Sequence, residues 1–205
     1  MSDKPAEITY PASKKLNVSY SAYEDRLLVR AERPGIDDAT LLMTRRMTLL
    51  LLQNVLSRLP ELSGLDKTPA AYWQEVLQMD HQGAMEAKSR ADTAEAEQHH
   101  ASGESVAGST GVAPAIYLAT ELTIQASRER LTLAFRGLHM PDAMTKVSKH
   151  VPILAIPLSL DNVHQLIELI ITKAREAGWH LPVDLPWLDS LNAVTTPGDV
   201  AFRAH

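Results

Sequence analysis

The spacing of hydrophobic and polar residues predicts three strands near the N-terminus. Residues 16–20 alternate apolar with polar side chains, which is typical of a half-buried strand. Residues 26–32 alternate in the same way, and the polar turn at 23–25 predicts that the two strands form a hairpin. A Pro-Gly pair ends the second strand, and residues 39–43 form a short third strand.

An amphipathic helix is expected after these strands. Thr44 has the side chain of an N-cap, and apolar residues then recur at helical spacing as far as Pro60. Residues 47–52 are apolar on nearly every side of this helix. We therefore expect the helix to be enclosed, either inside its own domain or against another chain.

The second half of the chain repeats this order of elements. Residues 116–125 and 130–136 predict another hairpin, and residues 151–158 predict a strand whose two prolines suit the edge of a sheet. Ser159 is positioned to cap a helix that ends just before Gly178, and this glycine suits the C-terminal cap.

A helix and a linker separate the two halves. Thr68 and Pro69 suit an N-cap and a first helical position, so they predict the start of a connecting helix. Residues 82–100 are rich in Ala, Glu and Gln and form either a solvated helix or a coil. Residues 101–113 are small, polar and rich in Gly and Ser, which is the composition of a flexible linker.

Comparison of the two halves reveals a weak internal repeat. Residues 18–32 align without a gap on residues 122–136, and after a length change residues 41–44 align on residues 156–159. Self-similarity of this kind indicates a repeated structural unit. We therefore predict an α+β fold in which two related β-β-β-α units pack as a pseudo-twofold pair, joined by a helix and a flexible linker.

These expectations divide the chain into six segments. A single β-β-β-α unit buries too little apolar surface to be stable alone, so each unit is expected to need the other or a second chain. The segments are a flexible N-terminal lead (1–15), the first unit (16–66), the connecting helix (67–100), the flexible linker (101–114), the second unit (115–187) and a C-terminal tail (188–205).

Composition excludes several classes of protein but does not indicate a reaction or a ligand. The chain has 205 residues, of which 45% are apolar, enough for a packed core. Its net charge of −5 argues against nucleic acid as a partner, because nucleic-acid-binding proteins carry a basic surface. The absence of cysteine excludes disulfides and thiolate nucleophiles. With no apolar stretch long enough to span a membrane and no signal-peptide core, we expect a cytoplasmic protein without a membrane partner.

Four arginines are the strongest candidates for a binding site. Arg45 and Arg46 directly follow the helix cap, where the positive partial charge of a helix N-terminus disfavours cations unless an anion lies nearby. Arg26 and Arg30 lie on one face of the second predicted strand (26–32). Together with Arg45 and Arg46 they could bind an anion or an acidic partner. In the structural alternative, the arginines cover the apolar helix or pair with nearby acids, which are Glu24, Glu32 and Asp37.

The histidines and hydroxyl side chains do not form a catalytic or metal-binding pattern. His164 and Glu168 stand four residues apart on one helix face, but two ligands need a third and a fourth to hold a metal ion. Ser105 and Ser109 lie in the linker and not in a nucleophile elbow. We therefore predict no catalytic residue, no metal site and no cofactor.

The segment after the last helix is aromatic and interrupted by prolines. Trp179, Leu185 and Trp187 either anchor an interface with a partner, as aromatic residues often do, or pack internally over the edge of the core. Together with the strongly apolar helix, this segment is a candidate partner surface.

These features favour a non-enzymatic protein-interaction module. We expect an adaptor or assembly factor of a bacterial-type cytoplasmic complex that binds a protein partner, with a homo-oligomer as a second arrangement. The alternative is a sensor or enzyme for a small anionic ligand, held by the arginine cluster at the helix N-terminus.

Overall fold

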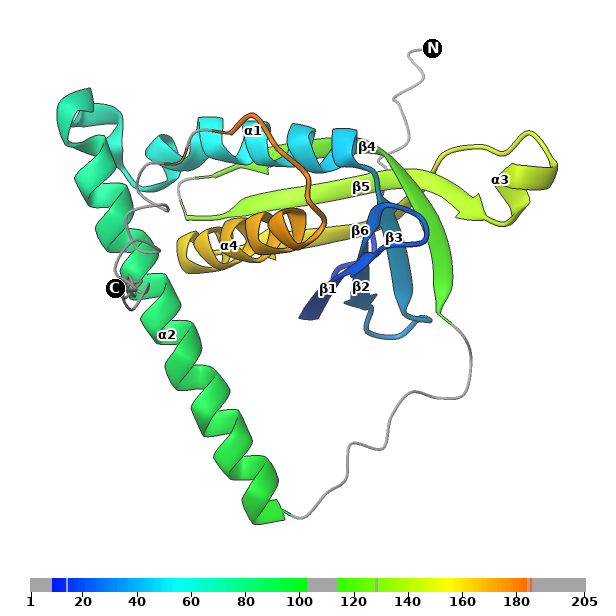
Figure 1. Ribbon diagram of the computed structural model, residues 1–205, viewed down its shortest axis with the longest axis horizontal. Helices are drawn as coiled ribbons and strands as arrows, with labels where there is room; N and C mark the ends of the chain where they lie inside the picture. The colour runs from blue at the N-terminus through cyan, green and yellow to red at the C-terminus, as the bar shows by residue number, and fades with distance from the viewer. Residues whose placement is uncertain (1–8, 14, 103–113, 128, 184, 186–205) are drawn as a thin grey trace, which may run out of the picture.

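The computed structural model describes residues 9–13, 15–102, 114–127, 129–183 and 185, which form an α+β fold with a six-stranded mixed sheet and four helices (Figure 1). The strands are β1 (Lys15–Ser21), β2 (Arg26–Glu32), β3 (Ala39–Met43), β4 (Ala115–Ala126), β5 (Leu131–Met140) and β6 (Val151–Leu158). The helices are α1 (Arg45–Leu62), α2 (Trp73–Ser102), α3 (Asp142–Thr145) and α4 (Leu160–Glu176).

Parts of the predicted organisation lie outside the described residues. These are most of the N-terminal lead (1–15), most of the linker (101–114), Trp187 and the tail (188–205).

The sheet places the two predicted β-β-β-α segments side by side. Its strand order is β1-β2-β3-β4-β5-β6, and neighbours are antiparallel except for the central pair, β3 and β4, which is parallel. A twofold axis would instead bring equivalent strands, such as β3 and β6, together as antiparallel neighbours. The pseudo-twofold pair is therefore not confirmed. A parallel central pair needs a long crossover, and α1 and α2 lie in that crossover.

Local sequence signals account for the ends of the helices. The Thr44 side chain accepts a hydrogen bond from the backbone N–H of Met47 at 3.2 Å, and Ser159 caps α4 in the same way. Gly178 has a φ of 66°, and the backbone N–H of Trp179 donates to the Ala174 carbonyl at 2.8 Å. This is the Schellman arrangement that glycine favours after a helix. The N-caps predicted at Thr44 and Ser159 and the C-terminal glycine cap are confirmed.

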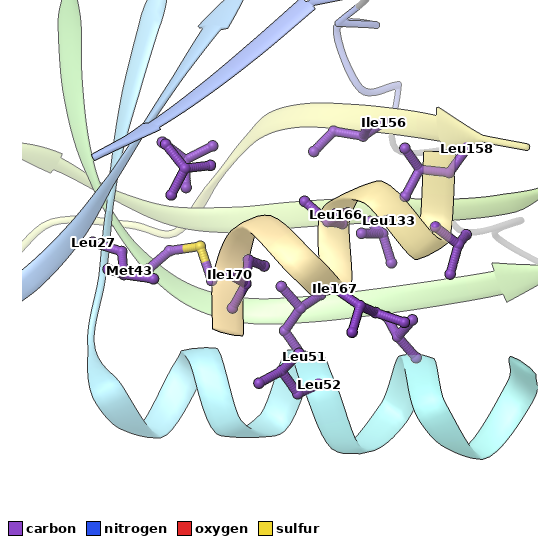
Figure 2. Close-up of a cluster of buried hydrophobic side chains, with 14 of the residues drawn as sticks. Leu27, Met43, Leu51, Leu52, Leu133, Ile156, Leu158, Leu166, Ile167 and Ile170 are labelled. Atoms are coloured by element: carbon purple, nitrogen blue, oxygen red, sulfur yellow. The ribbon is translucent and has the colours of Figure 1, made fainter. Parts of the chain in front are cut away.

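One hydrophobic core lies between the sheet and helices α1 and α4 (Figure 2). Alternate residues of β2 are buried in it, and Leu27 pairs with Met43 of β3. Leu51 and Leu52 of α1 pack against these strand residues. Apolar residues of α4, such as Ile167, complete the core. The strongly apolar start of α1 is thus mostly enclosed within its own chain, because several of its side chains face the sheet and α4.

The sheet is coiled, so that residues of β2 and β6 lie close together although three strands separate them in the strand order. Arg33, which follows β2, is 8% exposed and donates from Nη1 to the Ile153 carbonyl of β6 at 3.2 Å. Its Nε donates to the Asp37 carbonyl at 2.7 Å, and its guanidinium lies 5.9 Å from the ring centre of Tyr117. Ala12 adds a parallel bridge to Ala155 on β6.

Two bulges bend the central strands. The pairing register shifts in β4 between Ala119 and Glu121, and in the β5–β6 pair at Phe135 and Arg136. Next to them, a Cβ at Gly137 would collide with the backbone carbonyl of Leu118. Strand β5 continues past its predicted end at Arg136 to Met140, because Gly137 has no Cβ and lets the backbone of β5 approach that of β4.

The connecting helix begins later than predicted. Thr68 and Pro69 lead into a 3-10 turn (Ala70–Tyr72), and α2 begins at Trp73. The indole N–H of Trp73 donates to the Thr68 carbonyl at 2.8 Å, which stabilises this turn. The first half of α2 packs on α4, and Figure 1 shows the rest extending away from the sheet.

Candidate functional site

The N-terminus of α1 meets the segment that follows α4. Arg45, a predicted binding residue, donates from Nη2 to the backbone carbonyl of His180 at 2.9 Å. The structure thus joins two features that the sequence suggested separately, the arginines after the helix cap and the aromatic segment near Trp179. The carbonyl also explains how Arg45 is tolerated at a helix N-terminus, because it provides a partial negative charge.

A hydrogen-bonded turn fixes the other side of this junction. Asp25 Oδ1 accepts hydrogen bonds from Trp179 Nε1 at 2.6 Å and from the Tyr20 hydroxyl at 3.0 Å. The rings of Tyr20 and Trp179 pack edge to face, with centroids 6.2 Å apart. Desolvation raises the pKa of Tyr20, and the hydrogen bond to Asp25 adds to this shift. The turn between β1 and β2 therefore anchors the segment after α4.

The predicted aromatic interface residues lie inside the chain where they are described. Trp179 is 6% exposed and Leu185 is 5% exposed, and both belong to the hydrophobic core. They also line a cavity of about 380 Å³ between the end of α4 and the segment after it, defined here as the α4 cavity. Its other apolar walls come from Ile171, Ala174, Leu181 and Val183.

The remaining predicted arginines lie at the surface. Arg46 and Arg30 are exposed, and Arg26 is half-buried. Arg26 and Arg30 are on the sheet face opposite the buried residues of β2, about 13 Å apart along the strand. We refer to these three residues together as the arginine surface; Arg46 belongs to α1, on the core side of the sheet, whereas Arg26 and Arg30 face away from the core. In the part of the chain that the structure describes, none of the three side chains forms a hydrogen bond or ion pair, so the acidic neighbours expected from the sequence do not neutralise them.

A second cavity adjoins part of the arginine surface. It has a volume of about 610 Å³, and Arg30 and Lys15 line it together with the acidic residues Glu32, Asp37 and Asp38. The cavity therefore offers both cations and carboxylates to a bound group. It lies at the open end of the β1–β2 hairpin, away from the turn at Asp25 that contacts Trp179, and it shares no lining residue with the α4 cavity.

Two buried histidines meet between α2 and α4. His81 and His164 are at most 1% exposed, their ring centroids are 5.6 Å apart, and His81 Nε2 lies 3.5 Å from Glu168 Oε2. Desolvation, with the nearby His81, lowers the pKa of His164 to about 4. The hydrogen bond from His81 lowers the pKa of Glu168. His164 and Glu168 are recognisable in the sequence as neighbours on one helix face, whereas His81 is not linked to them there; its position between Leu77 and Ala84, on the buried side of α2, is the signal that could have identified it.

A network at the surface links the two bulged strands. Glu121 accepts a hydrogen bond from Arg136 Nη1 at 2.9 Å, and its other oxygen lies 2.6 Å from His150 Nδ1. The hydrogen bond from His150 lowers the pKa of Glu121, although burial opposes this shift. These groups fix the start of β6 against β4.

The described residues contain no group of three or more His, Asp or Glu side chains placed to hold a metal ion. Within the same residues, no helix is both long and apolar enough to cross a membrane. Comparison of the chain with protein-family models, curated proteins and solved structures found no match.

Proposed function

We propose that this chain is a non-enzymatic protein-interaction module, an adaptor or assembly factor that works in the cytoplasm. Its arginine surface, made of Arg26, Arg30 and Arg46, is proposed to bind an acidic region of a protein partner. Guanidinium groups suit this role because each can donate two parallel hydrogen bonds to a carboxylate.

One observation carries this proposal: the arginine surface lacks neutralising partners among the described residues. Arg46 is also on the first turn of α1, where the helix dipole repels a cation. A partner carboxylate placed there would interact favourably with both the guanidinium and the helix N-terminus. Arg45 is not part of this surface, since it binds the His180 carbonyl.

The free part of α2 supports the same class of function. The helix has 30 residues, and every side chain from 88 to 94 is exposed. A helix segment that is polar on all sides and lacks tertiary contacts is weakly stable by itself, whereas contact with a second molecule would stabilise it. The projecting half of α2 is therefore a second candidate contact region for the partner.

Charge reversal on the arginine surface tests the proposal. The Arg26→Glu/Arg46→Glu variant is expected to lose the proteins that co-purify with the wild-type chain from its native cell, while its melting temperature stays within a few degrees. Arg130→Glu, which reverses one charge, is the control, because Arg130 aligns with Arg26 in the internal repeat and lies at the surface. Equal recovery of partners by both variants would contradict the proposal. Light scattering would show whether a second copy of the chain is among the partners.

A second candidate function is binding of a small anionic ligand. Arg30 and Lys15 line the cavity of about 610 Å³ and would bind an anion there against the repulsion of Glu32, Asp37 and Asp38, which line the same cavity. A thermal-shift screen with phosphate, nucleotides and dicarboxylates separates the two functions. A ligand present at about 100 times its Kd would stabilise the chain by about 2.7 kcal/mol, and Arg30→Gln should remove that gain.

A further inference from the structure

A row of leucines crosses the face of the sheet that points away from the core. Each leucine is the cross-strand partner of the next, and we call the four together the leucine row. In strand order from β2 to β5 they are Leu28, Leu42, Leu118 and Leu138. None of them belongs to the hydrophobic core, because they alternate along their strands with the residues that do. Helices α1 and α4 pack on the opposite face (Figure 1).

The leucine row is part of a larger apolar patch with a polar border. Ile116 of β4 pairs with Met140 of β5 next to the row, and Ile116 is 42% exposed. The residues of the same face on β1 and at the far end of β4 are polar, namely Asn17, Ser19, Ser21, Thr123 and Gln125. A continuous apolar patch with a polar border is typical of an interaction surface.

Two arginines lie at the β2 end of this patch. Arg26 and Arg30 flank Leu28 on the same face of the strand, and within the described residues neither guanidinium forms an ion pair. Glu32 follows on this face, but Lys15 is its cross-strand neighbour and offsets its charge. The patch is therefore apolar across the central strands and cationic at one end.

We propose that this face of the sheet binds an acidic amphipathic segment of a partner protein. This inference rests on the proposed function and adds the chemistry of the partner. Apolar side chains of the segment contact the leucine row, and its carboxylates accept hydrogen bonds from Arg26 and Arg30. The row spans about 14 Å, because neighbouring strands lie about 4.8 Å apart, so a short segment covers it.

Two other occupants fit this face less well. A second copy stacked with the same face against it would place two cationic patches together, which is unfavourable. A lipid surface requires apolar side chains that project into it, whereas Leu42 is 6% exposed and the other leucines of the row are half-buried.

Photo-crosslinking in the native cell tests this proposal. Ile116→benzoylphenylalanine places a photoreactive side chain beside the leucine row. Irradiation should join the chain to a partner protein, and mass spectrometry of the joined peptide should show apolar residues with an excess of Asp and Glu over Lys and Arg. Gln125→benzoylphenylalanine is the control, because it lies on the same strand beyond the apolar patch, and it should not give this adduct.

A double variant separates this inference from the proposed function. Leu118→Gln/Leu138→Gln removes apolar contacts but keeps both arginines, and it should reduce the yield of the Ile116 adduct at least about tenfold. Leu50→Gln is the matched control, because it makes the same change at an exposed leucine of α1, and the adduct should persist. If circular dichroism shows that the double variant is unfolded, Leu138→Gln alone decides the question.

Several results would overturn the inference. These are the absence of a protein adduct at Ile116, an adduct with a lipid or a second copy of the chain, and a joined peptide without an excess of acidic residues. An adduct that persists in Leu118→Gln/Leu138→Gln but is lost in Arg26→Glu/Arg46→Glu would also overturn it, while the proposed function would stand. Persistence in both variants would contradict both proposals.

Discussion

Trp179 and Asp25 are 154 residues apart in the sequence, and the indole Nε1 of Trp179 donates to Asp25 Oδ1 at 2.6 Å. Asp25 also has a φ of 49°, a left-handed conformation that Asp and Asn adopt more readily than most residues. This one turn residue therefore shapes the β1–β2 hairpin and anchors the wall of the α4 cavity.

Replacement of Asp25 should show whether these two roles depend on the geometry of the side chain or on its charge. Asp25→Ala removes the acceptor of two hydrogen bonds and strains the left-handed turn, so we expect a loss of about 2 kcal/mol in the free energy of unfolding. Asp25→Asn keeps an acceptor oxygen and tolerates the turn, so its loss should be under about 1 kcal/mol. Urea unfolding measures both values. Equal losses would show that the carboxylate charge, and not the geometry, matters.

Arg33 should matter far more for stability than Arg30, although the two are three residues apart. Arg33→Ala removes the side-chain donor of the buried Ile153 carbonyl and of the partly buried Asp37 carbonyl, and we expect a loss of about 3 kcal/mol. Arg30→Ala changes an exposed side chain and should stay within about 0.5 kcal/mol of the wild type. Arg33→Lys should not restore stability, because a lysine cannot reproduce the planar fork that serves both carbonyls. Chemical unfolding of the three variants under one condition checks this order.

The buried histidine pair predicts a loss of stability in acid. The pKa of His164 is about 4 in the folded chain and about 6.5 when unfolded, so the unfolded chain binds the proton first as the pH falls. Stability should be complete above pH 6.5 and should fall by up to about 3 kcal/mol towards pH 4. Protonation of Glu168, whose pKa is lowered by His81, acts in the same direction at the acid end.

A pair of variants at the α2–α4 contact isolates the contribution of His164. His164→Leu cannot titrate, so its unfolding free energy should depend less steeply on pH between 6.5 and 4. Gln165→Leu removes the hydrogen bond to the Ala84 carbonyl in the same contact but keeps the histidine, so it should keep the wild-type slope. Parallel pH curves for His164→Leu and the wild type would disprove the assignment.

Two glycine-to-alanine changes should have opposite effects. A Cβ at Gly137 collides with the Leu118 carbonyl oxygen, so Gly137→Ala should cost at least about 2 kcal/mol. Gly83 lies within α2 with open space around it, so Gly83→Ala should stabilise the chain by about 0.5–1 kcal/mol. Melting curves of the two variants shift in opposite directions if the backbones of β4 and β5 approach as described.

Part of the candidate site could be predicted from the sequence. Arg45 and Arg46 could be identified as candidates because a cation at a helix N-terminus is unfavourable. The helix cap and the two arginines are adjacent in the sequence, so this unfavourable arrangement is visible without the structure. The partner of Arg45 could not be predicted, since it is the backbone carbonyl of His180 and carries no side-chain signal. His81 was missed for a related reason, because its partners His164 and Glu168 come from another helix.

The sequence by itself determined the order of the six strands and of helices α1, α2 and α4, the caps at Thr44 and Ser159, and the alternation of buried residues in β2, but it did not predict the short helix α3. These features depend on interactions within a few residues, which a linear pattern records directly. Only the tertiary structure decided that β3 and β4 pair in parallel, that the sheet coils until Arg33 reaches Ile153, and that Asp25 binds Trp179. Such contacts join residues that are far apart in the chain, and many pairings have similar local energies. Simultaneous packing of the whole core selects one of them.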